Sequence, residues 1–222
     1  MSIASQLNEI KTHLPASVKL VAVSKFHAPK AILKAYNEGQ RIFGESRVQE
    51  LLEKKDHLPD DIQWHFIGHL QRNKVKEIVP FVSLIQGVDS TRLLREINKR
   101  GSEIGRKINC LLQIHIAEES SKFGFSFEEC RELLKSDEWH SFSNIQICGV
   151  MGMATFTDNK EQVRKEFQSL NNFFKEIKDK YFDEDSLFSE ISMGMSEDYT
   201  IAIEEGSTLI RIGTAVFGER EY

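Results

Sequence analysis

The chain has 222 residues, of which 40% are hydrophobic and 28% are charged, and its formal net charge is −5. This balance predicts one soluble globular domain over residues 1–222 that needs neither metal nor disulfides to fold. The acidic balance and the lack of a dense Lys/Arg tract argue against nucleic-acid binding, and no apolar run approaches the ~20 residues of a transmembrane helix.

The first expected element is an amphipathic helix over about residues 2–14, because Ile3, Leu7 and Ile10 recur at helical spacing. Short β-rich runs then alternate with longer helical patterns. Strands are expected at residues 18–23, 41–43, 63–67, 82–86, 109–116, 146–151, 188–192 and 208–212. The clearest helices are expected at about residues 91–103, 160–180 and 196–206, the last with Ser196 as N-cap and Gly206 just past its end.

This alternation implies parallel strands, which either close into a barrel or form an open doubly wound sheet. About eight units favour an α/β fold with a single closed (β/α)8 TIM-type barrel and an extra N-terminal helix. An open sheet should carry a glycine-rich dinucleotide fingerprint after its first strand, and residues 23–27 (VSKFH) contain no glycine. We therefore expect the barrel.

Lys25 follows the end of the first expected strand, and the functional groups of such barrels collect at the carboxyl ends of the strands. Burial at the barrel rim disfavours the ammonium form and leaves a nucleophilic amine, which Schiff-base chemistry requires. The alternative is an ordinary solvated or salt-bridged lysine.

The last two units contain segments that suit an anion. Residues 192–196 (SMGMS) follow the seventh strand, and residues 211–214 (RIGT) end the eighth. Small residues let backbone N–H groups approach a phosphate, hydroxyls add donors, and loops after strands seven and eight commonly hold phosphate in these barrels. Alternatively, Ser196 only caps its helix, with Glu197 and Asp198 interacting with the helix dipole.

Arg211 lies between Ile210 and Ile212 in an apolar strand. Because side chains alternate along a strand, Arg211 should point into the barrel while both isoleucines face the helices. A buried guanidinium requires hydrogen-bond acceptors, which we expect from a ligand or an internal carboxylate.

Metal and disulfide sites are not expected. His65 and His69 bracket a strand end without a third ligand, which makes zinc binding improbable. Cys110, Cys130 and Cys148 are far apart and lack metal-binding spacing, which indicates a reducing cytoplasm.

Several motifs together resemble one family. They are residues 21–25 (VAVSK), 43–45 (FGE) with 48–50 (VQE), 64–68 (WHFIG) with 70–71 (LQ) and 73–74 (NK), 192–196 (SMGMS) and 211–218 (RIGTAVFG). In this order they resemble the pyridoxal phosphate homeostasis proteins, small barrels that bind pyridoxal 5′-phosphate (PLP) and are similar to the N-terminal domain of alanine racemase.

The resemblance implies a fold-type III PLP barrel with PLP as a Schiff base on Lys25 and Arg211 against the pyridine nitrogen. It implies that the phosphate is bound by Ser192, Met195, Ser196, Gly213 and Thr214. It also implies that Ile67 and Met151 line the site. The family commonly has Asn where Ser46 stands here, and many relatives have Pro in place of His69.

The expected function is reversible PLP binding for PLP (vitamin B6) homeostasis, with delivery to PLP-accepting apoenzymes and no catalytic residue. A cationic Arg211 keeps the pyridine nitrogen unprotonated and therefore a weak electron sink. Alanine racemase adds a Tyr base from a separate domain, and only eleven residues follow Arg211 here. Tyr199 and Tyr222 are poor replacements, and the resemblance suggests a monomer.

Two alternatives stay open. The first is a weak PLP-dependent racemase or lyase of amino acids, with His65 or a partner chain as general base. The second is a barrel enzyme for a phosphorylated metabolite, in which Lys25 forms a Schiff base with the substrate itself.

Overall fold

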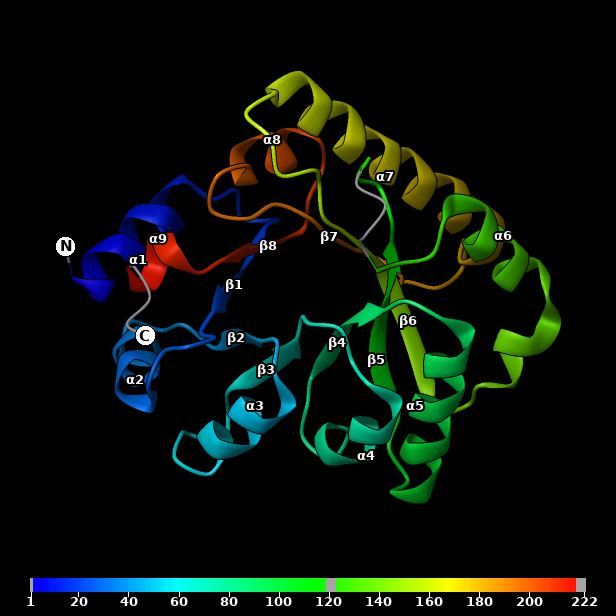
Figure 1. Ribbon diagram of the computed structural model, residues 1–222, viewed down its shortest axis with the longest axis horizontal. Helices are drawn as coiled ribbons and strands as arrows, with labels where there is room; N and C mark the ends of the chain where they lie inside the picture. Colours follow the sequence, from blue (N-terminus) through cyan, green and yellow to red (C-terminus); the bar gives the residue numbers. More distant parts are fainter. Residues whose placement is uncertain (1, 119–122, 219–222) are drawn as a thin grey trace.

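In the computed structural model, which describes residues 2–118 and 123–218, eight parallel strands close into a barrel in sequence order, with β8 pairing to β1 (Figure 1). The strands are β1 (Lys19–Val23), β2 (Ile42–Glu45), β3 (Gln63–Phe66), β4 (Leu84–Val88), β5 (Ile108–Ile114), β6 (Ile145–Gly152), β7 (Glu190–Ser192) and β8 (Leu209–Ile212). The predicted (β/α)8 barrel is thus confirmed.

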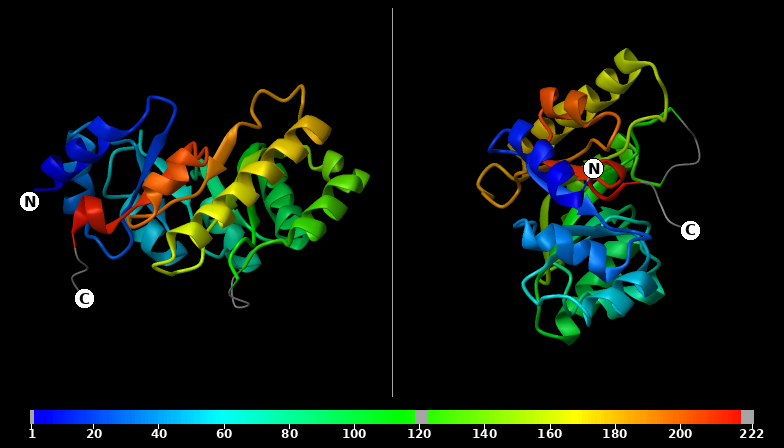
Figure 2. Two further views of the ribbon diagram at one scale, coloured as in Figure 1. Left: turned by 90° about the horizontal axis from the view of Figure 1, so that it is seen from above. Right: turned by 90° about the vertical axis from the view of Figure 1, so that its left-hand side faces the viewer.

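Helices follow the strands and cover the outside of the barrel (Figures 1 and 2). They are α1 (Ile3–His13), α2 (Pro29–Asn37), α3 (Val48–Lys55), α4 (Val75–Ile78), α5 (Thr91–Glu103), α6 (Phe127–Lys135), α7 (Lys160–Tyr181), α8 (Tyr199–Glu204) and α9 (Thr214–Phe217), with short 3-10 turns η1 (Arg72–Lys74) and η2 (Asp137–Ser141). The extra helix α1 lies beside α9. No helix in the described part of the chain is long and apolar enough to cross a membrane.

Alternation along the strands divides the apolar residues into two layers. Ile210 and Ile212 belong to the large core between strands and helices, as expected. Leu209 instead belongs to a smaller cluster with residues of β1, β4, β5 and β6, which are Val21, Leu84, Leu111 and Met151. This cluster fills the inside of the barrel, so the barrel is a packed core and functional groups are left to its rim.

One predicted helix is shorter than expected. Residues 195–198 form a turn in which the Asp198 carboxylate accepts from the backbone N–H of Met195 at 2.5 Å, and α8 begins only at Tyr199. Ser196 is therefore not the N-cap of this helix, because a carboxylate that bonds locally to the backbone favours a turn over a helix. Gly206, at φ +96°, follows the helix end as expected.

Candidate functional site

A cavity of about 540 Å³ opens at the carboxyl ends of the strands. Its wall is built by residues at the ends of, or just after, β1, β2, β3, β5, β6, β7 and β8. Seven of the nine predicted site residues lie in this wall, namely Lys25, Ile67, Met195, Ser196, Arg211, Gly213 and Thr214. The barrel thus gathers residues that are up to 189 positions apart. The volume of the cavity is in the range of small-ligand sites.

Lys25 stands in the turn after β1 and is half-buried. The residue before it, Ser24, is fully buried, and the residue after it, Phe26, has a left-handed backbone with φ +68°. Such a conformation is uncommon for a residue other than glycine, and it sets the direction of the chain immediately beyond Lys25.

Arg211 points into the barrel and is 4% exposed, as alternation predicted. Its Nη1 donates to Ser192 Oγ at 2.6 Å and its Nη2 to the carbonyl of Gly152 at 3.0 Å. Strand β7 thus supplies a hydroxyl and strand β6 a carbonyl for these two bonds, where a ligand or an internal carboxylate was expected. Burial lowers the pKa of Arg211 to about 10, which still leaves the side chain cationic at neutral pH.

A chain of hydrogen bonds continues from Arg211 across the barrel. Because Arg only donates, Ser192 accepts from it and gives its own proton to Gln86 Oε1 at 2.6 Å. Gln86 Nε2 then donates to His65 Nδ1 at 2.9 Å, so the proton of neutral His65 is on Nε2. Burial lowers the pKa of His65 to about 3 and keeps the ring neutral.

Two predicted residues contribute from behind the wall. Ser192 is fully buried and reaches the site through Arg211. Met151 is also fully buried and belongs to the cluster inside the barrel. In the described part of the chain, neither lies in the cavity wall, where Met153 takes the place that Met151 was expected to have.

The segments after β7 and β8 give the cavity its donors. Thr214 opens α9, and the N–H groups of Val216 and Phe217 in this short helix already donate to the carbonyl of Gly213, both at 2.9 Å. A Cβ at Gly213 would lie 3.2 Å from the carbonyl of Val23, so glycine keeps this corner open. Gly194 adopts φ +94°, and a Cβ there would lie 2.6 Å from Ala202 Cβ, so only glycine lets this segment turn above α8.

Carboxylates also face this cavity. Glu197 and Asp198 lie in the wall, and burial is the main cause that raises the pKa of Asp198, while the Met195 N–H and Arg211 oppose that rise. Arg211 supplies positive charge from β8. The Arg211 guanidinium and the Ser196 and Thr214 hydroxyls give the cavity wall donors that suit an anion.

Sequence reasoning missed a histidine–carboxylate pair whose histidine, His69, lies in the cavity wall. His69 Nδ1 lies 2.8 Å from Asp89 Oδ2, and the imidazole stacks on Phe123 with ring centroids 4.0 Å apart. Asp89 follows β4 and His69 follows β3, so adjacent strand ends bring them together. The signal was available in part, because His69 was already noted as a departure from the family pattern.

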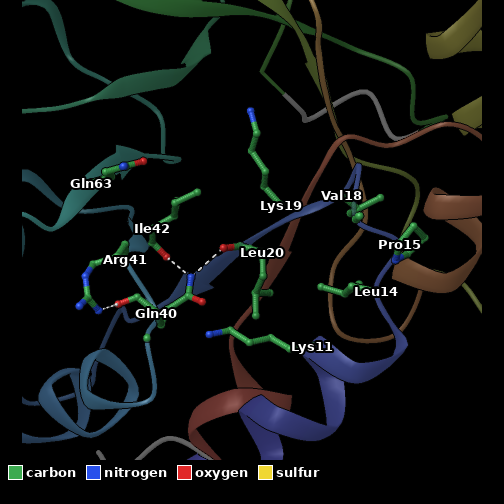
Figure 3. Close-up of a pocket in the computed structure, with 12 residues that line it drawn as sticks. Lys11, Leu14, Pro15, Val18, Lys19, Leu20, Gln40, Arg41, Ile42 and Gln63 are labelled. Carbon is green, nitrogen blue, oxygen red and sulfur yellow. Dashed lines mark hydrogen bonds between the residues drawn. The ribbon is translucent and has the colours of Figure 1, made fainter.

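Other hollows lie away from this rim. One of about 420 Å³ is at the amino end of β1, where the Gln40 amide donates to the carbonyls of Leu20 and Ile42 (Figure 3). Arg41 there pairs with Asp61, so its charge is balanced locally. The described residues contain no group of three or more His, Cys, Asp or Glu that could hold a metal ion.

Comparison with known proteins gives consistent results. The family model described as "Alanine racemase, N-terminal domain" matches residues 1–221. The pyridoxal phosphate homeostasis protein of Aquifex aeolicus is 38% identical over 205 residues, which are 92% of this chain and 88% of that protein. The protein of the same name from Vibrio alginolyticus is 38% identical over 94% of this chain and 89% of its own length.

Solved structures show the same relation. PipY of Synechococcus elongatus with PLP bound is 35% identical and has a TM-score of 0.89, over 98% of this chain and all of that chain (100%). The alanine racemase of Clostridium difficile has a TM-score of 0.72 at 18% identity and matches over only 56% of its length, a likeness of fold alone.

Proposed function

Because the chain belongs to the pyridoxal phosphate homeostasis protein family, we propose that it binds PLP as a Schiff base on Lys25 and serves PLP homeostasis in the cytoplasm, without strong catalytic turnover. The observation that carries this proposal is the convergence of Lys25, Arg211 and the segments after β7 and β8 on one cavity. When bound, PLP supplies an aldehyde that condenses with an amine and a pyridine ring that withdraws electrons.

The residues of the cavity fit this cofactor. The amine of Lys25 would hold the aldehyde carbon, and the Ser196 and Thr214 hydroxyls with the N–H of Thr214 would hold the phosphate. The N–H of Met195 is bonded to Asp198, so Met195 would contribute its 38% exposed side chain. Ile67 would add an apolar surface at the rim.

Arg211 supports storage over turnover. Its guanidinium stays cationic and is held by Ser192 and Gly152, so it would meet the pyridine nitrogen as a hydrogen-bond donor. A fixed positive charge beside that nitrogen disfavours its protonation and makes the ring a weaker electron sink. The bound aldehyde would thus be masked while amino-acid chemistry stays slow, and PLP could pass on to apoenzymes.

The test is covalent mapping. Titration of the purified protein with PLP should produce the visible absorbance of a protein-bound imine, and borohydride followed by peptide mass spectrometry should place the adduct on Lys25. Lys25→Ala should abolish both signals. Lys30→Ala, an exposed lysine on α2, is the matched control and should retain both. An adduct on another residue, or none at all, refutes the proposal.

The His69–Asp89 pair favours a second candidate, a weak PLP-dependent racemase or lyase. A carboxylate that accepts from Nδ1–H leaves Nε2 as a base, and His69 lies in the wall of the same cavity as Lys25. His65, the base considered from the sequence, is bonded to Gln86 inside the barrel and lines a different hollow at the amino ends of the strands.

Proton exchange separates the two functions. The PLP-loaded protein would be incubated with L-amino acids in D₂O, and α-proton exchange would be followed by NMR against free PLP. The enzyme is established if exchange is well above that of free PLP, is lost in His69→Gln and is retained in His57→Gln. His57 is an exposed histidine and serves as the control. Exchange no faster than with free PLP refutes it.

A further inference from the structure

A buried ion cluster lies behind the turn that carries Lys25. Lys54 Nζ donates to Glu45 Oε1 at 2.7 Å and to Glu50 Oε1 at 2.6 Å. The side chains of Lys54, Glu45 and Glu50 are 6%, 0% and 18% exposed. We call these three residues the Lys54 cluster.

The Lys54 cluster bonds to the backbone on both sides of Lys25. On one side, Lys54 Nζ donates to the Ser24 carbonyl at 2.7 Å, and Ser24 Oγ donates to Glu45 Oε1 at 2.6 Å. On the other side, the N–H of Phe26 donates to Glu50 Oε1 at 2.5 Å. The residues that flank Lys25 are therefore both tied to one cluster, which itself is outside the cavity wall.

The turn held in this way is strained. In the described part of the chain, Phe26 is the one residue other than glycine with a positive φ, at +68°. A left-handed residue with a Cβ costs backbone free energy and persists only where its surroundings impose it. The guanidinium of Arg47, 4.7 Å from the centre of the Phe26 ring, adds a contact on the side chain.

The cluster is a poor device for stability alone. The cluster sets two carboxyl groups against one amine where water is largely excluded, and Glu45 Oε2 is buried without a hydrogen-bond partner among the described residues. Burial is the main cause that raises the pKa of Glu45. Replacing such buried ions with apolar residues often costs nothing, so their presence calls for a positional role.

We propose that Glu50 and Lys54 are positioning residues that impose the left-handed turn at Phe26 and thereby direct the Lys25 amine into the cavity. The proposal rests on the proposed function only in naming Lys25 as the attachment point. Neither residue would contact PLP, since both act through the backbone of residues 24–26.

The first test removes the acceptor at Phe26. In Glu50→Ala we expect faster hydrogen exchange at the Phe26 amide in the free protein. We also expect a roughly tenfold weaker attachment of PLP to Lys25, because a tenfold change matches the free-energy cost of holding a residue with a Cβ in the left-handed conformation. Glu53→Ala, an exposed carboxylate on the same helix, is the matched control and should change neither. Unchanged exchange and unchanged attachment in Glu50→Ala overturn the proposal.

The second test separates positioning from general structural support. Glycine adopts a positive φ without a Cβ penalty, so in a Phe26→Gly background the Glu50→Ala change should weaken attachment far less than in the native background. An equal loss in both backgrounds contradicts the proposal. Should Glu50→Ala not fold, Glu50→Gln, which keeps an acceptor but not its charge, is measured in the same way and should show a smaller loss of the same kind.

The two proposals fail in different ways. If native protein gains no adduct on Lys25, the proposed function is refuted, while hydrogen exchange at Phe26 still decides whether Glu50 holds the turn. If native protein gains the adduct and Glu50→Ala gains it equally well with the same exchange, only the positioning role is refuted.

Discussion

The hydroxyl of Ser192 should be among the most sensitive polar groups of this protein. It accepts from the Arg211 guanidinium and donates to Gln86 Oε1, both at 2.6 Å and fully buried. Ser192→Ala leaves both partners without this bond. A buried hydrogen bond to a charged group contributes about 1.5–3 kcal/mol and an unsatisfied neutral acceptor costs about 1 kcal/mol or more, so we expect a loss of about 2–4 kcal/mol.

Urea unfolding of the PLP-free protein measures this loss. Ser189→Ala, at an exposed position just before β7, is the control and should change the unfolding free energy by less than about 0.5 kcal/mol. In an Arg211→Met background the charged donor is gone, so Ser192→Ala should cost at least about 1 kcal/mol less than in the native background. A loss below about 1 kcal/mol in the native background, or equal losses in both, would refute the network as described.

Three further predictions concern the backbone, pH and thiols. Gly194→Ala should cost at least about 2 kcal/mol more in thermal unfolding than Gly105→Ala, because both have positive φ but only Gly194 would meet a side chain, 2.6 Å away. Burial lowers the pKa of His65 from 6.5 to about 3, so the unfolded state binds a proton that the folded state excludes. The titration of His65 therefore leaves the free energy of unfolding unchanged above pH 6.5 and lowers it as pH falls toward 3. Between pH 6.5 and 4.5, native protein should therefore lose about 2–3 kcal/mol more than His65→Gln in urea unfolding, and equal losses would contradict the neutral ring. Burial raises the pKa of Cys148 to about 11 and that of Cys130 to about 12, so both should resist alkylation at pH 8 until the protein is unfolded; rapid native labelling would show that these thiols are accessible and ionised.

Local patterns in the sequence were enough for the architecture. Apolar periodicity separated strands from helices, and the number of units predicted a closed barrel because eight parallel strands with short connections have few other solutions. The same alternation placed Arg211 inside the barrel, and the position of Lys25 after β1 placed it at the rim. Both inferences depend only on neighbours along the chain.

Contacts between distant strands were decided by the tertiary structure. The acceptors of Arg211 are on β6 and β7, and the partners of Ser24 and Phe26 are on β2 and α3. Barrel closure and strand register bring such groups together, and neither is encoded in the spacing of residues along one segment. Asp198 similarly shortened the helix expected from residue 196, because a side chain competed successfully for a backbone amide.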